Sequence, residues 1–448
     1  MKKNSDLEIR KIVLEALIQS EKSNIPSHIL IKDVLDKYDY LSKNEKALMS
    51  TIFKGVIERR IELDYVIDHF SKTPAKKMKM PVRIILEMGV YQILYMNSFD
   101  TLAVNTSVEL AKKKGFATLS GFVNAVLRNI ERNKNDIEYP KKGEKDYLSV
   151  KYSIPSFITD LLSEQYDADV LEKMFDASLK NDHLRVRLRE AADAEKKNAV
   201  IKEIRDKGAE ITQTAGFDDL YKVKGVGNIS ELKSFTDGDI YIQDTGSYIL
   251  CKNVSGGKNI LDACAAPGGK SIFLSERFPD SVITACDVSD EKLKKMAENT
   301  ERCKVSNVKI KKADATVFNP EWEEYFDVVL CDVPCSGLGV IGKKQDIKYN
   351  LSPEGLESLY ELQKNILANV SRYVKKDGYL IYSTCTVNKK ENEYRVEEFL
   401  KNGGFEYSEF AFLPDEYKNG YNGRTLSLIQ GQNDSDGFFT VVLKRKKQ

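Results

Sequence analysis

From about residue 239 onward, short apolar runs alternate regularly with segments of helical periodicity. The apolar runs predict five strands, at residues 258–263, 282–287, 308–313, 327–333 and 378–384. The clearest helical pattern lies between the last two strands, at residues 353–374. Strands that alternate with helices pair into a parallel sheet covered on both faces. The pattern therefore predicts a doubly wound, Rossmann-like α/β domain over residues 239–448.

Three of these predicted strands end in residues that can carry chemistry. The run NILDACAAPGGKS (Asn259–Ser271) ends in a glycine turn, FDVVLCDVP leads from Asp332 to Cys335, and GYLIYSTC ends at Cys385. In open α/β sheets the ligand crevice lies at the carboxyl ends of the strands. We therefore expect one crevice to contain two thiols, an acid and a glycine turn that approaches a small molecule closely.

A free cysteine is most often a small buried apolar residue. That interpretation suits five of the seven cysteines: Cys251, Cys264, Cys286, Cys303 and Cys331. Cys335 and Cys385 differ, because each follows an apolar run and lies among small polar residues. These two are the candidates for reactive thiols.

The first 140 residues have a different pattern, with apolar residues at helical spacing almost throughout. They predict a helical domain over residues 1–140, and the polar stretch 139–147 reads as a linker. Mixed strand and helix signals then predict a small α/β module over residues 148–235. Basic clusters at 72–83 and 111–115 favour nucleic-acid contact, although such clusters are often only solvated surface.

The cysteine count and the hydropathy of the chain indicate where it works. Seven cysteines without paired short spacings do not form a disulfide framework and favour a reducing compartment. The N-terminus lacks the uninterrupted apolar core of a signal peptide, and no apolar run is long enough to span a bilayer. We expect a cytoplasmic protein with no membrane contact.

The glycine turn has two possible ligands. Gly269, Lys270 and Ser271 match a phosphate-binding P-loop, but Cys264 stands where its first glycine belongs. A nucleotide hydrolase is therefore one alternative. Against it, Asp287 ends the next strand, where nucleoside-binding sheets place a carboxylate that accepts ribose hydroxyls. A magnesium site also gives no reason for a Pro-Cys pair directly after Asp332.

Five ordered segments resemble the NOP2/Sun group of RNA cytosine-C5 methyltransferases, which use S-adenosylmethionine. They are LDACAAPGGK, the acid of CDVSD, the acid of KADA, DVPCSG and YSTCT. Residues 44–67 and 89–130 resemble the NusB-like RNA-binding domain of the bacterial enzymes that act on 16S ribosomal RNA. Residues 436–446, DGFFTVVLKRK, resemble the closing strand of the group. The resemblance covers nearly the whole chain.

The resemblance implies a role for each matching residue. The cofactor loop would comprise Cys264, Ala265, Ala266, Pro267, Gly268, Gly269 and Lys270. Asp287 would hold the cofactor ribose and Asp314 its adenine amino group. Asp332, next to both cofactor and base, and Cys335 would lie at the target cytosine, and Cys385 would be the nucleophile. No metal is implied, and we expect a monomer whose partner is a single-stranded or loop cytosine of 16S ribosomal RNA.

Methylation of carbon 5 of cytosine requires the same residue types. Carbon 5 is a weak nucleophile, so a thiolate must first add to carbon 6, which places negative charge on N3. Asp332 could neutralise that charge by donating a proton, and Cys335 could assist the later release of the base. In an alternative of the DNA methyltransferase type, Cys335 is the nucleophile and Cys385 is structural. In another, a NusB-like protein binds RNA through a domain that does not catalyse.

Histidines and one altered segment refine these expectations. All three histidines, His28, His69 and His183, precede the predicted catalytic domain, which disfavours a Cys-His pair. The group usually has an arginine-rich segment after its Pro-Cys motif, whereas this chain has GKKQDIKYN at 342–350. Gly342 cannot make the bidentate contacts of an arginine. We expect Lys343, Lys344 and Lys348 to keep the positive charge of the segment.

Overall fold

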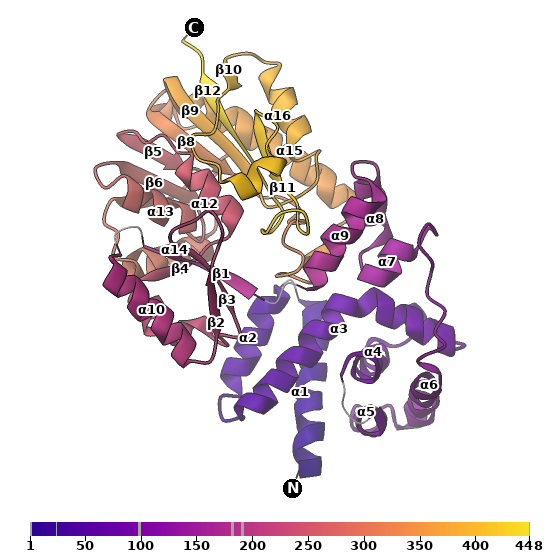
Figure 1. Cartoon of the computed structure of the whole chain (residues 1–448). Helices are drawn as coiled ribbons and strands as arrows, with labels where there is room; N and C mark the ends of the chain where they lie inside the picture. The colour runs from indigo at the N-terminus through magenta and orange to yellow at the C-terminus, as the bar shows by residue number, and fades with distance from the viewer. Residues whose placement is uncertain (1, 24, 97–99, 181–182, 190–191, 448) are drawn as a thin grey trace. The chain divides into compact units, whose positions relative to one another are not determined.

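The computed structural model describes the chain apart from residues 1, 24, 97–99, 181–182, 190–191 and 448 (Figure 1). It contains two compact units. The first unit comprises residues 1–172 and 341–350, and the second comprises 173–340 and 351–448. No helix within the described part of the chain is both long and apolar enough to cross a membrane.

The first unit is helical, as its periodicity predicted. Its α-helices are α1 (Lys2–Lys22), α2 (Ser27–Lys37), α3 (Lys43–Phe70), α4 (Met80–Tyr95), α5 (Asp100–Lys113), α6 (Ser120–Asn133), α7 (Tyr147–Tyr152) and α8 (Ser156–Ser163). Helix α9 (Ala168–Leu179) begins in this unit and continues into the second.

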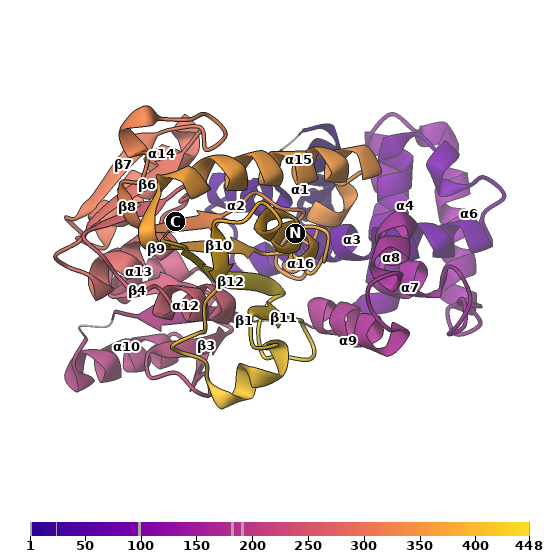
Figure 2. The same ribbon diagram turned by 90° about the horizontal axis from the view of Figure 1, so that it is seen from above.

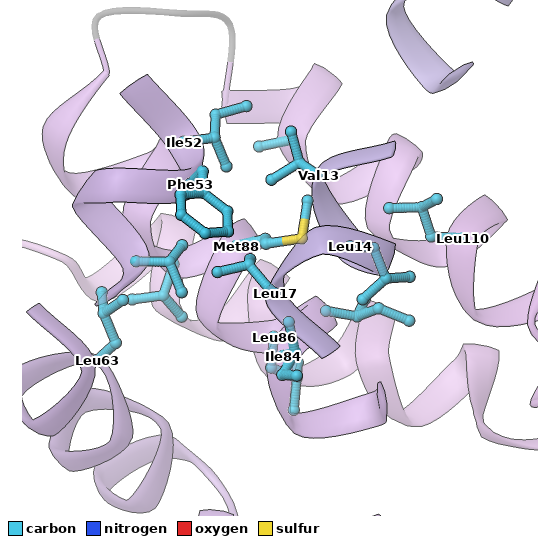
Figure 3. Packing of buried hydrophobic residues seen from close by; sticks show 14 of the residues in the cluster. Val13, Leu14, Leu17, Ile52, Phe53, Leu63, Ile84, Leu86, Met88 and Leu110 are labelled. Atoms are coloured by element: carbon cyan, nitrogen blue, oxygen red, sulfur yellow. The ribbon is translucent and has the colours of Figure 1, made fainter. Parts of the chain in front are cut away.

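Local sequence signals fix the ends of several of these helices. Helix α3 starts with a capping box, in which the Ser42 side chain accepts from the Glu45 backbone and the Glu45 side chain accepts from the Ser42 backbone. Pro81 lies in the first turn of α4, where its missing N–H costs nothing. Apolar stripes of α1, α3, α4 and α5 then pack together, with Leu17, Phe53 and Met88 among the buried residues (Figure 3).

The second unit begins with a small antiparallel sheet. Its elements are β1 (His183–Leu188), α10 (Ala194–Asp206), β2 (Glu210–Gln213), β3 (Leu220–Lys224), α11 (Lys233–Thr236) and β4 (Ile240–Ile242). The strand order is β2-β3-β1-β4, and Val200 and Ile204 of α10 belong to the same apolar core as the strands. The mixed strand and helix signals of this region are confirmed.

A larger sheet forms the rest of the second unit. Its strands are β5 (Asn259–Asp262), β6 (Val282–Asp287), β7 (Val308–Lys312), β8 (Phe326–Asp332), β9 (Val374–Thr384), β10 (Phe405–Tyr407), β11 (Thr425–Leu428) and β12 (Phe438–Arg445). The order is β10-β12-β9-β8-β5-β6-β7, with β11 also paired to β12 (Figure 1). The five strands predicted from the alternation are parallel, as expected.

The other three strands are not parallel, so the sheet is mixed rather than wholly parallel. Strand β12 runs antiparallel to β9, and β10 and β11 pair antiparallel with β12. Hairpin-like returns at the C-terminus need no crossover helix, which is why the strand-helix alternation did not reveal them.

Helices cover both faces of this sheet. Alternate residues of β8 point in opposite directions: Val328 and Leu330 join one apolar core, and Val329 and Cys331 join the other. Helices α12 (Thr245–Lys252) and α13 (Gly269–Arg277) pack on the first face, and α15 (Pro353–Val370) and α16 (Glu393–Leu400) pack on the second. Figure 2 shows α15 from above. Helix α14 (Asp290–Arg302) joins β6 to β7.

The domain boundaries derived from the sequence, 1–140, 148–235 and 239–448, remain a proposal about autonomous folding. The described units divide the chain at Glu172, inside α9, and they assign the segment 341–350 to the helical unit. This segment leaves the larger unit after Val340 and returns to it at Leu351.

Candidate active site

The predicted site residues of the second unit gather at one edge of the large sheet. The strands β5, β6, β8 and β9 are parallel and end at Asp262, Asp287, Asp332 and Thr384. The chain proceeds from β5 outward through β6 and β7 on one side, and through β8 and β9 on the other. The point between β5 and β8 is thus a topological switch point, where open α/β sheets bind ligands.

Both candidate thiols lie at this edge, and they are in contact. Cys335 Sγ and Cys385 Sγ are 3.2 Å apart, although fifty residues separate them along the chain. The contact with Cys385 raises the pKa of the Cys335 thiol well above its ordinary value, and burial and the nearby Glu391 carboxylate raise it further. These surroundings favour the neutral thiol form of Cys335.

The backbone beside Cys385 is packed so closely that it requires glycine. The Gly339 N–H donates to the Cys385 carbonyl at 3.1 Å, and the Gly437 N–H donates to the Gly339 carbonyl at 2.8 Å. A Cβ on Gly339 would lie 2.2 Å from the Gly437 carbonyl oxygen. Gly339 thus fixes the strand end that carries Cys385, a role that the sequence pattern did not reveal.

Asp332 is held by two side chains. Lys270 Nζ lies 2.6 Å from Asp332 Oδ2, and Ser383 Oγ donates to Asp332 Oδ1 at 2.6 Å. Burial would lower the pKa of Lys270, but the Asp332 carboxylate more than offsets it, so that pKa lies above its ordinary value. The pair joins a residue predicted for cofactor binding to one predicted for the base.

The glycine turn connects β5 to α13. Gly268 has a φ of 102°, in the left-handed region that favours glycine, and α13 begins at the next residue. Ser271 Oγ donates to Asp262 Oδ2 at 2.6 Å, and Asp262 Oδ1 is buried without a hydrogen-bond partner among the described residues. Burial raises the pKa of Asp262 to about 6.

The next two predicted carboxylates follow β6 and β7. Asp287 is buried, and its Oδ1 accepts from the Ser289 N–H at 3.0 Å, while Lys292 Nζ lies 3.7 Å from Oδ2. Asp314 is exposed and accepts from the backbone and the hydroxyl of Thr316, which lower the pKa of Asp314. Cys264 is half-buried, and burial raises its pKa.

The charges at this edge fit a cationic ligand better than a polyphosphate. Four strand-end carboxylates belong to it: Asp262, Asp287, Asp314 and Asp332. The two groups that a P-loop offers to phosphate and magnesium are already bound to carboxylates, Lys270 to Asp332 and Ser271 to Asp262. A sulfonium ion with an ammonium group meets complementary charge here, whereas a triphosphate meets repulsion.

One sequence expectation about charge is wrong. Lys348 is fully buried, and its Nζ donates to the Glu58 carbonyl at 2.8 Å within the helical unit. Burial lowers the pKa of Lys348 to about 7. In the same segment Asp346 accepts from the backbone and the hydroxyl of Ser27. Lys348 therefore does not present its charge on the surface, because a run of lysines does not show which member faces inward.

Comparisons with known proteins identify the family of the chain. Residues 249–444 match the family 16S rRNA methyltransferase RsmB/F, and residues 7–132 match the NusB family. The probable ribosomal RNA small subunit methyltransferase B of Bacillus subtilis is 31% identical over the full length of both chains. The chain belongs to the RsmB family of ribosomal RNA small subunit methyltransferases.

Solved structures support the fold of this family member. The crystal structure of PH0851 superposes with a TM-score of 0.82 at 25% identity, covering 98% of this chain and 99% of that one. NSun6 from Pyrococcus horikoshii with SFG is 19% identical, with a TM-score of 0.58 over 66% of this chain and 98% of that one. At that identity the second comparison shows the fold alone.

Membership of this family implies S-adenosylmethionine as the methyl donor and RNA as the substrate. The acidic strand ends and the buried Asp262 oxygen, which has no hydrogen-bond partner in the described part of the chain, fit that cofactor, because it carries a sulfonium and an ammonium group. We propose that residues 264–270 hold its methionine end, that Asp287 holds the ribose and that Asp314 holds the adenine.

Asp287→Ala is expected to weaken S-adenosylmethionine binding by about 1.5–3 kcal/mol, the scale of a hydrogen bond to a charged group. Titration calorimetry measures the change, and Asp290→Ala, at an exposed position three residues later, serves as the matched control. ATP at equal concentration should not compete. Equal binding by wild type and Asp287→Ala would contradict the ribose assignment.

Proposed function

We propose that this enzyme methylates carbon 5 of a cytosine in 16S ribosomal RNA through a covalent bond between Cys385 and carbon 6. One observation carries the proposal: two thiols 3.2 Å apart lie at the same sheet edge as the Asp332–Lys270 pair. Methylation at carbon 5 of cytosine needs a sulfur nucleophile, a group that neutralises the negative charge at N3 and a group that assists release of the base from the enzyme.

The state of Cys335 favours Cys385 as the nucleophile. The two sulfurs lie 3.2 Å apart and either could donate, and we assign the S–H donor to Cys335 because the nearby Glu391 carboxylate raises the pKa of that thiol. A hydrogen bond to sulfur stabilises the thiolate form, and the thiolate is the nucleophilic form of cysteine. Cys385 then adds to carbon 6 while Cys335 remains a neutral thiol.

The remaining steps use groups at the same edge. When Cys385 adds to carbon 6, N3 of the base becomes basic, and we assign to Asp332 the relay of a proton from Lys270, 2.6 Å away. S-Adenosylmethionine supplies the methyl group as an electrophile. The C5–H bond and the bond between carbon 6 and the Cys385 sulfur must then break. We assign this release to Cys335: its S–H donates its proton to the departing Cys385 sulfur, 3.2 Å away, and the resulting Cys335 thiolate accepts the carbon 5 proton, while the N3 proton returns to Lys270 through Asp332.

We also propose an RNA-binding groove on the helical unit. A groove of about 670 Å³ lies between α6 and residues 70–73 at the end of α3. It is lined by Phe70, Ser71, Lys72, Thr73, Phe122, Asn124, Ala125, Val126, Arg128, Asn129 and Arg132. None of these described lining residues is acidic. Arginine and lysine suit phosphates, and phenylalanine rings suit unstacked bases, so the lining fits single-stranded RNA.

The electrostatic part of this groove is testable through salt. Arg128 is paired with Glu131 at 2.7 Å, so Lys72 and Arg132 are the lining cations chosen for the test. Changing both to glutamate should weaken RNA binding and lower the slope of log K against log salt by about 0.7 for each phosphate that the protein no longer neutralises. Fluorescence anisotropy measures both quantities. Lys54→Glu, at an exposed position outside the groove, is the control.

An unchanged slope in the Lys72 and Arg132 variant would contradict RNA binding at this groove. If the groove retains a protein partner while the RNA affinity of the variant equals that of wild type, the groove binds protein rather than RNA. Neither outcome bears on the chemistry at the sheet edge.

Bisulfite sequencing of 16S ribosomal RNA from a strain without this enzyme tests the reaction itself. One cytosine that is protected in wild type should become convertible, and purified enzyme with S-adenosylmethionine should restore protection. An intact pattern of protected cytosines would contradict the proposal. We further propose that the enzyme acts in the cytoplasm as a monomer.

A further inference from the structure

Glu391 is a fully buried carboxylate close to the two thiols. It lies in the loop between β9 and α16 and is 0% exposed. Burying a charge is costly unless hydrogen bonds replace the lost water. Glu391 is not among the residues that the family motifs pointed to, and a glutamate in the polar run TVNKKENE looks like a surface residue from its sequence alone.

Four hydrogen bonds compensate this buried charge. Glu391 Oε2 accepts from the Ser336 N–H at 2.8 Å and from Gln363 Nε2 at 2.9 Å. Glu391 Oε1 accepts from Ser336 Oγ at 2.5 Å and from Asn388 Nδ2 at 3.0 Å. All four contacts donate to Glu391, which matches a side chain whose two oxygens act as acceptors.

These contacts join the two loops that carry the thiols. Ser336 directly follows Cys335, and its hydroxyl also contacts Thr386 Oγ1 at 2.7 Å, in the residue after Cys385. Gln363 of α15 donates to the Pro334 carbonyl as well, at 2.9 Å. The Glu391 backbone is itself fixed, because the Tyr382 hydroxyl donates to its carbonyl at 2.7 Å.

We propose that Glu391 is a positioning residue that holds the Cys335 and Cys385 loops at contact distance for the adduct and release steps. This inference rests on the proposed cytosine C5 chemistry. The hydrogen bonds of Glu391 go to neighbours of the thiols, so it acts through Ser336 and Asn388. Its negative charge also opposes ionisation of Cys335, which keeps that thiol protonated beside the nucleophile.

Glu391→Gln tests this role with little change in volume. The amide oxygen can still accept from the Ser336 N–H, but the amide nitrogen places a donor against Asn388 Nδ2, so the bond to Asn388 is lost together with the negative charge. We expect kcat to fall about 100-fold, the scale of a misplacement of about 1 Å, with the KM for RNA and the affinity for S-adenosylmethionine unchanged. Ser336→Ala removes one of the four bonds and should give a smaller loss in the same direction. Glu397→Gln, exposed on α16, is the matched control.

A second readout does not depend on methylation. Alkylation of Cys335 by iodoacetamide, followed by peptide mass spectrometry over a pH series, reports the ionisation of that thiol directly. In Glu391→Gln the midpoint for Cys335 should move to lower pH, because a nearby negative charge has gone. The same profile in Glu397→Gln should match wild type.

The outcomes separate this inference from the proposed function. If wild type does not methylate cytosine yet the Cys335 midpoint still moves in Glu391→Gln, the proposed function fails while the charge effect stands. An unchanged kcat with an unchanged midpoint would overturn the positioning role. If Glu391→Gln loses its circular dichroism spectrum, the folded Ser336→Ala variant decides the question, and a kcat equal to that of wild type in Ser336→Ala would overturn the positioning role.

Discussion

Cys385→Ala is expected to lose methylation by a factor on the order of 10⁴ or more and to form no covalent complex with RNA, because it lacks the sulfur that adds to carbon 6. Cys335→Ala should still add to the base and then stall. Its adduct should appear as a slowly migrating band on a denaturing gel. The two thiols lie 3.2 Å apart, so their positions alone do not decide which one is the nucleophile, and the opposite results expected for the two variants do.

RNA containing 5-fluorocytosine provides an independent check on wild type. Fluorine cannot leave as the carbon 5 proton does, so the adduct should persist and be trapped. Cys303→Ala serves as the control, because Cys303 is a buried thiol of a separate apolar cluster. A stalled adduct with Cys385→Ala and none with Cys335→Ala would reverse the assignment and establish the DNA-type order of roles.

Lys270→Met is expected to lower the free energy of unfolding by about 2–4 kcal/mol and to abolish measurable methylation. The side chains of Lys270 and Asp332 are 16% and 26% exposed, so removal of one leaves the other charge largely out of water. Asp332→Leu should destabilise the protein similarly. The double variant should recover most of the stability, because no unpaired charge remains, yet it should stay inactive.

Chemical denaturation measures the free energy of unfolding of wild type, the two single variants and the double variant. A methyl-transfer assay measures their activity. The matched control is the Lys312–Asp290 pair, whose side chains are 57% and 78% exposed at an N–O distance of 2.6 Å. Lys312→Met should cost less than about 1 kcal/mol, as loss of one partner of an exposed pair usually does. If the double variant is as unstable as the sum of the two single variants, the pair is not the electrostatic unit that we infer.

The sequence was informative about this site because strand ends can be located from local patterns. Apolar runs marked the ends of β5, β6, β8 and β9, and the βα order placed them at one edge. The sequence was less informative about the burial of polar residues away from these strand ends. Glu391 and Lys348 look like solvated side chains in the sequence, yet both are fully buried.

The sequence by itself determined the helical unit, the five parallel strands and the strand-end position of Asp332, Cys335 and Cys385, because hydrophobic periodicity and element order are local properties. Only the tertiary structure decided which of these residues touch. The Cys335–Cys385 contact, the Lys270–Asp332 pair and the bonds from Ser336 and Gln363 to Glu391 join residues 28 to 62 positions apart. Burial of a polar group depends on the donors that packing brings around it, and residue type alone does not specify them.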